Sequence, residues 1–468
     1  MAEIPYRFDP DTRVEKLIAD YADLDPATET DDVVTIAGRL MLRRVQGKLA
    51  FGTLDDGSGR IQLFAPSKTT TDFDQFCDLN LGDWIGVTGI VMTTRRGELS
   101  VRVDSWTRLA EARRPFPDKW HGISDTDTRY RQRYVDLWVS PEARNVFKIR
   151  SKMMSLTRSF LEARGAIEVE TPMFHPIPGG ANARPFTTHH NALDLDLYLR
   201  VAPELYLKRL TVAGFEKVFE IGRVFRNEGV STRHNPEFTM LELYEAYADY
   251  EDIMQLVEEL VEYLAVELTG STILKIDGQE LDVARPWRRA TMVELIEEAI
   301  GTTLSLDTPL DELRAVAADH EVPIKESYGP GKLILEIYEK TTESALWGPV
   351  YVTDYPIEVS PLSREHRSEA GMTERFEAIL AGRELCNGFS ELIDPEQQRL
   401  RFEEQAAQNA SGDDEAMLVD EDYLRALEYG LPPTGGVGIG MDRLAMLLTG
   451  TTSIRDVVLF PTLRPEQN

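Results

Sequence analysis

The stretch that most constrains the fold is residues 217–247, which predicts two β-strands joined by a polar loop. Its first part is rich in Val, Phe and Ile, its middle contains Gly, Ser, Asn and Pro, and its last part alternates apolar with polar residues. Because successive side chains of a strand point to opposite faces, Val224, Arg226 and Glu228 are expected on one face of the first strand. The residues expected on one face of the second strand are Phe238, Met240, Glu242 and Tyr244.

The polar positions of this hairpin have two interpretations. Most charged side chains on a hairpin are solvated and take part in no chemistry. Here they stand between large apolar residues, and burying a charge is costly unless it is paired or binds a ligand. Arg226 suits a phosphate, because a planar guanidinium donates two parallel hydrogen bonds. With Phe238 placed to stack under a base, the pattern favours a nucleotide site.

The same segment resembles motif 2 of the class II aminoacyl-tRNA synthetases. Residues 225–228 and 233–239 carry the resemblance, and the continuation through 240–250 is similar to the lysyl-tRNA synthetases in particular. The resemblance implies that Arg226 is catalytic and stabilises the transition state at the α-phosphate of ATP. The ATP-binding residues that it implies are Arg226, Asn227, Glu228, His234, Asn235, Phe238, Glu384 and Arg443.

Composition limits the class of protein. A chain of 468 residues is long enough for two or three domains, and 42% hydrophobic with 28% charged residues is ordinary for a soluble protein. There is no apolar run long enough to span a membrane and no charged-then-apolar leader, so we expect a cytoplasmic protein without membrane contact. Cys77 and Cys386 provide neither a disulfide framework nor a zinc site. The net charge of −29 argues against indiscriminate nucleic-acid binding, although residues 33–138 are mildly basic and suit RNA.

The N-terminal part predicts a small barrel. Five short strands and one helix are typical of a closed barrel of the OB type. This part resembles the anticodon-binding domain of lysyl-tRNA synthetases, which implies that Phe51 stacks on an anticodon base while Arg43 and Gln62 read base edges. The alternative is that Phe51 belongs to the barrel core. The predicted segments are a short acidic stretch (1–32), the barrel (33–110), a linker (111–138) and a large domain (139–468).

Two parts of the large domain resemble further class II motifs. Residues 146–172 predict a helix and a strand and match motif 1, which implies a homodimer. Residues 435–449 predict a glycine-rich strand leading into a helix and match motif 3, where Arg443 would cap the adenine against Phe238. The predicted fold class is α+β and multidomain: a five-stranded barrel plus a large domain on a mostly antiparallel sheet flanked by helices.

Residues 375–393 predict a hairpin in which Ile379 pairs with Glu384. Glu377 is then a diagonal neighbour of Glu384 on the same face. Like charges held together are unfavourable unless a cation joins them, and Mg²⁺ takes such carboxylates together with nucleotide phosphates. A solvated pair is the alternative, but the resemblance implies Mg²⁺, with more than one ion accompanying ATP. Glu377 and Glu384 are therefore the predicted metal ligands.

An acidic amino-acid pocket is the remaining expectation. Glu391 lies an odd number of residues beyond Glu384, so a regular strand would place the two side chains on opposite faces. A bulge at Gly388 would instead place them on the same face. Glu204 also fits a structural role in the first turn of a helix. The lysine-binding residues implied by the resemblance are Gly180, Glu204, Glu242, Tyr244, Asn387, Phe389 and Glu391. Their three carboxylates predict a substrate with two ammonium groups.

The resemblance implies activation of L-lysine with ATP, followed by transfer of the lysyl group to tRNA(Lys). One alternative is a relative that activates lysine but transfers it to an acceptor other than tRNA. A second alternative is a non-enzymatic RNA-binding protein on a decayed synthetase scaffold. Its signature would be the loss of motif residues, yet Arg226, Phe238 and Arg443 are all retained.

Overall fold

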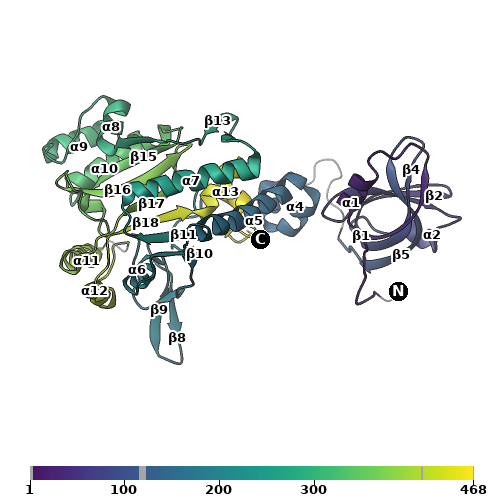
Figure 1. Cartoon of the computed structure of the whole chain (residues 1–468), viewed down its shortest axis with the longest axis horizontal. Coiled ribbons are helices and arrows are strands. Elements are labelled where there is room, and N and C mark those ends of the chain that lie inside the picture. The colour runs from purple at the N-terminus through teal and green to yellow at the C-terminus, as the bar shows by residue number, and fades with distance from the viewer. Residues whose placement is uncertain (1–3, 115–122, 413–414, 467–468) are drawn as a thin grey trace. The chain divides into compact units, whose positions relative to one another are not determined.

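The structure, a computed structural model, describes three parts of the chain: residues 4–114, 123–412 and 415–466. The chain divides into two compact units (Figure 1). Unit 1 contains residues 1–129 and 134–140, and unit 2 contains residues 130–133 and 141–468. The finer division into four segments stays a prediction.

Unit 1 is built on a closed barrel with the strand order β1-β2-β3-β5-β4. Its strands pair antiparallel except for β3 and β5, which are parallel. Alternate residues of β3, namely Ile61, Leu63 and Ala65, are buried in the barrel core. The elements are α1 (Val14–Asp20), β1 (Glu29–Gln46), β2 (Leu49–Asp55), β3 (Arg60–Pro66), α2 (Phe73–Cys77), β4 (Trp84–Thr93) and β5 (Leu99–Ala110). The predicted five-stranded barrel is confirmed.

Unit 2 is organised by an eight-stranded sheet with the order β14-β15-β16-β17-β18-β11-β10-β6. Its neighbouring strands are antiparallel except for the pairs β14–β15 and β10–β6. The strands are β6 (Ile167–Glu168), β10 (Lys217–Phe225), β11 (Glu237–Ala246), β14 (Arg288–Thr291), β15 (Val350–Pro356), β16 (Met372–Leu380), β17 (Arg383–Ser390) and β18 (Thr434–Gly440). The predicted α+β class with a mostly antiparallel sheet is confirmed.

Helices cover one face of this sheet. The largest core joins α5 (Pro141–Glu162), α7 (Tyr250–Thr269) and α13 (Met441–Thr449) to the central strands, and Figure 1 shows the three helices lying along the sheet. The remaining helices are α3 (Thr126–Arg131), α4 (Arg133–Val139), α6 (Glu204–Val212), α8 (Met292–Ile300), α9 (Leu310–Asp319), α10 (Pro330–Thr341), α11 (Pro395–Ala410), α12 (Glu421–Glu428) and α14 (Ile454–Val457). Short strands form two further sheets: β7 (Phe174–His175), β8 (Thr187–His190) and β9 (Leu195–Leu199), and β12 (Ile273–Ile276) with β13 (Gln279–Asp282).

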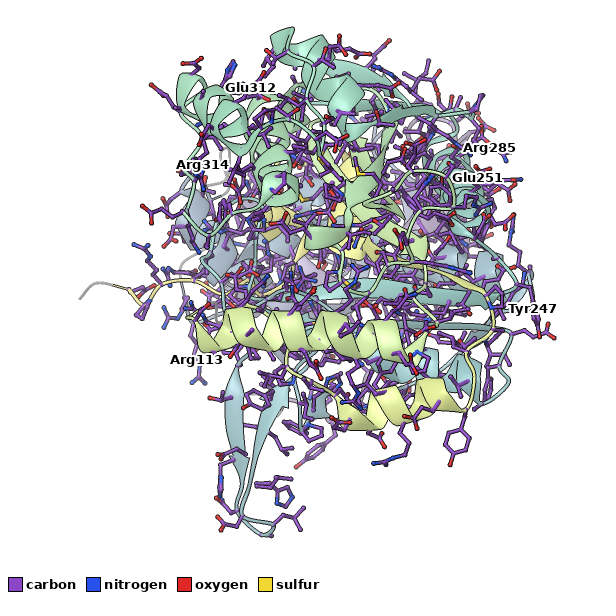
Figure 2. The ribbon with its side chains drawn as sticks, turned by 90° about the vertical axis from the view of Figure 1, so that its left-hand side faces the viewer. Arg113, Tyr247, Glu251, Arg285, Glu312 and Arg314 are labelled. Atoms are coloured by element: carbon purple, nitrogen blue, oxygen red, sulfur yellow. The ribbon has the colours of Figure 1, made fainter. Side chains whose placement is uncertain are left out.

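The solvent side of α7 is polar. Arg285 forms ion pairs with Glu259 and Glu262 of this helix. Figure 2 shows Arg285 and Glu251 at the outer edge of the molecule. The helix begins at a capping box formed by Asp249 and ends at a glycine with positive φ, so the apolar stripe between them is held against the sheet.

The alternation of β11 directs its side chains as the sequence predicted. Leu241 and Leu243 pack into the core beneath α7 and α13. Met240, Glu242 and Tyr244 point to the opposite face, where they line a cavity. One strand therefore supplies both the apolar support and the polar floor of that cavity.

One local prediction was wrong. Strand β10 ends at Phe225, so Arg226 and Glu228 lie in the following loop and do not continue the strand face of Val224. The ladder stops after Arg226, because the N–H of Asn227 donates to the carbonyl of Arg184 and the N–H of Glu228 donates to the carbonyl of Arg226, each at 2.8 Å.

The sequence left open whether the β16–β17 hairpin contains a bulge, and the structure shows one. Ile379 pairs with Glu384 as predicted, and Ala378 pairs with Cys386. The extra residue is thus Leu385, whereas Gly388 keeps a regular pairing on both sides of its strand. Because the bulge lies next to the turn, it reverses the alternation of side-chain faces along β17 before the pocket residues begin.

Candidate active site

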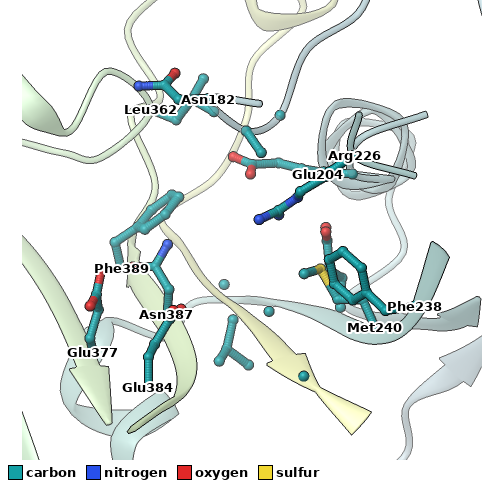
Figure 3. A pocket seen from close by; sticks show the side chains of 18 of the residues that line it. Asn182, Glu204, Arg226, Phe238, Met240, Leu362, Glu377, Glu384, Asn387 and Phe389 are labelled. Carbon is teal, nitrogen blue, oxygen red and sulfur yellow. The ribbon is translucent and has the colours of Figure 1, made fainter. Parts of the chain in front are cut away.

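A cavity of about 350 Å³ lies over the sheet face opposite α7 and α13. Figure 3 shows Arg226, Phe238 and Met240 on one side of it and Glu377, Asn387 and Phe389 on the other. Among the described residues of unit 2, Asn227 is the predicted site residue that does not line it; its backbone N–H donates to the carbonyl of Arg184. The predicted residues that line it are Gly180, Glu204, Arg226, Glu228, His234, Asn235, Phe238, Glu242, Tyr244, Glu377, Glu384, Asn387, Phe389, Glu391 and Arg443.

Arg226 is one of the cations that line this cavity. Its guanidinium carbon lies 5.2 Å from the ring centre of Phe238. Its Nε is buried and has no hydrogen-bond partner among the described residues. Burial lowers the pKa of Arg226, although Glu384 and Glu228 oppose that change. An unsatisfied buried donor is costly, so the position calls for an anionic ligand.

The carboxylates of the β16–β17 hairpin are each held by an arginine. Arg443, in the first turn of α13, donates from Nη1 to the Oε2 of Glu384 at 2.9 Å. Arg375 donates from Nη2 to the Oε1 of Glu377 at 2.7 Å. Burial and the charge of Glu384 raise the pKa of Glu377 to about 7. For Glu384, burial alone would raise the pKa, but Arg443 outweighs it and the pKa is lowered.

The fit of this pair to a divalent cation depends on additional ligands. Within the described ranges, no group of three or more His, Cys, Asp or Glu is arranged to hold a metal. Mg²⁺ in nucleotide sites is commonly bound through one or two carboxylates, with phosphate and water oxygens completing its shell. Glu377 and Glu384 line the cavity together, and a cation would relieve the repulsion that raises the pKa of Glu377. The pair therefore fits Mg²⁺ delivered with a nucleotide.

The loop between β10 and β11 contributes two further residues. The side chain of Asn235 donates to the carbonyl of Glu237 and accepts from the N–H of Thr462, so it ties the loop to the C-terminal segment. His234 lies at the cavity wall, where burial and then Arg443 lower its pKa. A neutral imidazole is thus the form presented to a ligand.

The other half of the cavity is an acidic socket. Glu204, Glu242 and Glu391 are buried around it. The hydroxyl of Tyr244 donates to the Oε2 of Glu242 at 3.0 Å. Burial, followed by the charge of Glu204, raises the pKa of Glu242 to about 8, and burial raises that of Glu391 well above its usual range. Three carboxylates desolvated together favour a polycationic ligand.

Glycines shape the floor of this socket. A Cβ built on Gly436 of β18 would lie 2.1 Å from Oε1 of Glu391 and 2.6 Å from the ring of Tyr244. Such distances are shorter than any normal contact, so only glycine allows the two side chains to occupy their places. Gly180, which also lines the cavity, has φ +89°, and a Cβ built on it would lie 3.0 Å from the Cβ of Glu204.

Sequence reasoning missed two cations that touch the predicted residues. Lys208 of α6 lies 2.5 Å from the Oε1 of Glu204 and forms an ion pair with Glu391. Arg375 also donates from Nε to the Oδ1 of Asn387 at 2.9 Å. Spacing offered a partial signal: Lys208 is one helical turn from Glu204, and Arg375 is two strand positions from Glu377.

The predicted anticodon residues lie in unit 1. The register places Arg44 opposite Phe51, with the guanidinium carbon 5.2 Å from the ring centre. Phe51 is half-buried and packs against Phe64 with ring centres 5.5 Å apart. Gln62, on the same face, donates to the hydroxyl of Ser100 at 2.9 Å. Arg43 pairs with a glycine on the other face and donates to the carbonyl of Leu79.

Comparison with known proteins identifies the family. A model described as tRNA synthetases class II (D, K and N) matches residues 125–464, and a model of the OB-fold nucleic acid binding domain matches residues 34–109. The chain belongs to the class II tRNA synthetases. The resemblance noted in the sequence is thereby confirmed, and the barrel of this synthetase is an OB-fold domain.

Curated relatives of this class II synthetase carry the name Lysine--tRNA ligase. The protein of Xanthomonas oryzae pv. oryzae (strain MAFF 311018) is 54% identical over 457 residues, which cover 96% of this chain and 90% of the relative. That of Synechococcus sp. (strain RCC307) is 52% identical, covering 99% and 93%. That of Prochlorococcus marinus (strain MIT 9303) is 53% identical, covering 99% and 94%. In the described parts of the synthetase, none of the helices has the length and apolarity to cross a membrane.

Proposed function

We propose that this class II synthetase is a lysine–tRNA ligase. It activates L-lysine with ATP to form lysyl-adenylate and pyrophosphate, and then transfers the lysyl group to the 3′ end of tRNA(Lys). The observation that carries the proposal is one cavity in which three buried carboxylates lie beside Arg226, whose buried Nε has no hydrogen-bond partner in the part of the chain that the structure describes. Relatives named Lysine--tRNA ligase, more than half identical across nearly the whole chain, support the same activity.

The amino-acid half of the cavity fits lysine by its charge. Glu204 binds the α-ammonium group, while Glu391 and Tyr244 bind the ε-ammonium group at the other end. Asn387 and Gly180 border the backbone of the substrate, and Phe389 contacts its methylene chain. The remaining carboxylate, Glu242, adds to the negative potential of the buried site. An acidic amino acid would meet three like charges and be rejected.

The nucleotide half positions ATP for attack by the lysine carboxylate. The adenine lies between Phe238 and Arg443, with His234 and Asn235 along its edge. Arg226 contacts both the substrate carboxylate and the α-phosphate. A carboxylate oxygen forms the new bond to phosphorus as the bond to pyrophosphate breaks. No side chain needs to act as a nucleophile, so rate enhancement comes from positioning and from neutralising the charge of the transition state.

Mg²⁺ held by Glu377 and Glu384, with more than one ion accompanying ATP, would supply further neutralisation of the triphosphate. Arg375 and Arg443 hold these two carboxylates in place. Asn227 and Glu228 complete the nucleotide loop. The arginines therefore set the geometry of the acidic pair before the nucleotide enters.

The barrel of unit 1 binds the anticodon. Phe51 stacks on a base and Gln62, on the same face, reads a base edge. Arg44 takes the place expected for Arg43, because Arg43 lies on the other face and donates to the carbonyl of Leu79. The half-buried ring of Phe51, with Arg44 above it, supports this placement because it leaves a π-face next to a cation. We also propose a homodimer in the cytoplasm. The dimer contact would use the short edge strand β6, where Ile167 is 50% exposed, and the nearby Phe174, which is 56% exposed.

The test of the proposed function is aminoacylation of total tRNA with labelled lysine. The expected result is lysine attached to one tRNA species and AMP released in equal amount. Lysine-dependent ATP–pyrophosphate exchange without any charged tRNA would instead indicate an acceptor other than tRNA. A folded chain without lysine-dependent exchange would contradict the proposed function as a whole.

A further inference from the structure

One fully buried cation of unit 2 has no part in the activity described so far. Lys208, on α6, has no exposed side-chain surface. Its Nζ lies 2.5 Å from Oε1 of Glu204, one helical turn away, and also forms an ion pair with Glu391. Glu204 and Glu391 line the cavity, and Lys208 lies behind them. A single ammonium group thus joins the two carboxylates from the protein side.

Aromatic rings enclose the same ammonium group. Its Nζ lies 5.2 Å from the ring centre of Phe389 and 5.8 Å from that of Tyr244. Both rings also line the cavity. An ammonium group desolvated against aromatic faces and two carboxylates is held in one position, so it in turn fixes the groups that it contacts.

The charge of the socket follows from these contacts. Burial would lower the pKa of Lys208, but Glu204 and Glu391 outweigh it and raise the pKa, so the group stays protonated. Besides Glu204 on its own helix, the titratable groups facing it are Glu391 after β17, Tyr244 on β11 and Tyr423 on α12. When lysine is bound and Glu204, Glu242 and Glu391 are all ionised, the ammonium group of Lys208 and the two ammonium groups of lysine balance the three negative charges.

We propose that Lys208 is a positioning and specificity-determining residue of the amino-acid socket. It is a fixed counter-ion, shared by Glu204 and Glu391, that fixes the position of the two carboxylates relative to each other. It also supplies one of the three positive charges that balance the three carboxylates once a diamino acid is bound. This inference rests on the proposed function, because it assigns the origin of lysine specificity within the same cavity.

The proposal predicts a distinct effect of removing the charge. In Lys208→Met the carboxylates lose their counter-ion, so their pKa values rise and they take up protons in the empty enzyme. Lysine binding must then displace those protons. Affinity for lysine therefore falls at neutral pH and recovers as pH rises. A side chain that served only to fill space would not change the number of protons released.

The test compares Lys208→Met with wild type and with Arg209→Met. Arg209, the next residue of α6, pairs with Asp420 outside the socket, so it controls for loss of a helix ion pair. Lysine-dependent ATP–pyrophosphate exchange gives the KM for lysine and for ATP. Calorimetry in two buffers of different ionisation enthalpy gives the protons released on lysine binding.

For Lys208→Met we expect the KM for lysine to rise at least about tenfold, because the variant breaks a charged pair in a buried site. The KM for ATP should stay within about twofold of the wild-type value. We also expect up to one more proton released per lysine than in wild type. Arg209→Met should match wild type in both. Equal rises in both KM values, or an unchanged proton count, would overturn the proposal.

A second variant applies if Lys208→Met does not fold. Lys208→Arg keeps the charge, so it should keep the proton count of wild type and the selectivity for lysine over norleucine, which lacks the second ammonium group. Loss of that selectivity in a folded Lys208→Arg enzyme would refute the role of the charge. Failure of the proposed function is distinguishable, because the wild-type chain itself would then show no lysine-dependent exchange.

Discussion

Replacing Gly436 with alanine should close the lysine socket without affecting the nucleotide half. The new Cβ would lie 2.1 Å from Oε1 of Glu391 and 2.6 Å from the ring of Tyr244, so both side chains must move by an ångström or so. Overpacking of this kind costs about 1–3 kcal/mol. At about 1.4 kcal/mol for each factor of ten, the KM for lysine should rise by about 5- to 150-fold.

The assay for Gly436→Ala is lysine-dependent ATP–pyrophosphate exchange with each substrate varied in turn. The matched control is Gly435→Ala, whose Cβ points to the opposite face of β18 and would meet Ile253 at 2.6 Å and the carbonyl of Asp249 at 2.9 Å. The control should lower the Tm but leave the KM for lysine unchanged. An unchanged KM for lysine in Gly436→Ala, or an equal rise in both variants, would refute the assignment of the socket.

Three other predictions concern Arg226, Glu242 and the barrel residue Phe51. Arg226→Ala should lower kcat for exchange by about 10²- to 10³-fold, the loss expected for one donor to a developing charge, and a change in KM alone would contradict its role. Because the pKa of Glu242 is raised to about 8 and the ionised form binds lysine, the KM for lysine should fall about fivefold between pH 7 and 8. The pH profile of Glu242→Gln should lack this step. Phe51→Ala should raise the KM for tRNA by about 5- to 150-fold, from the loss of about 1–3 kcal/mol of stacking, and leave exchange at the wild-type rate.

The predictions that succeeded rest on local patterns. The alternation of apolar and polar residues assigned Met240, Glu242 and Tyr244 to one face, because strand parity is set by neighbouring residues alone. The pairing of Ile379 with Glu384 followed from a tight turn between them. In both cases a few adjacent residues contain all the information that the geometry requires.

The register could not be predicted where a backbone irregularity reversed the alternation of side chains between the two faces of a strand. The bulge at Leu385 lies next to the turn, where no glycine marks it. In the barrel, a register shift between Leu40 and Leu42 brings Arg44 rather than Arg43 over Phe51. Such irregularities are imposed by the curvature of the sheet or barrel, which single-strand patterns do not contain.

The buried cations depended on contacts between distant segments. In the sequence Lys208 has the pattern of an ordinary polar residue of an amphipathic helix, and its second partner, Glu391, comes from the distant segment that follows strand β17. Arg375 likewise reads as a surface residue of a strand until its partners Glu377 and Asn387 are placed beside it. Only the folded chain brings these charges together.

The most direct test of the central claim is ATP–pyrophosphate exchange by the wild-type chain with each of the amino acids in turn, and with norleucine. We expect strong exchange with lysine and almost none with norleucine, aspartate or asparagine, because the socket of Glu204, Glu242 and Glu391 requires two ammonium groups. Exchange supported equally by norleucine, or better by an acidic amino acid, would contradict that claim.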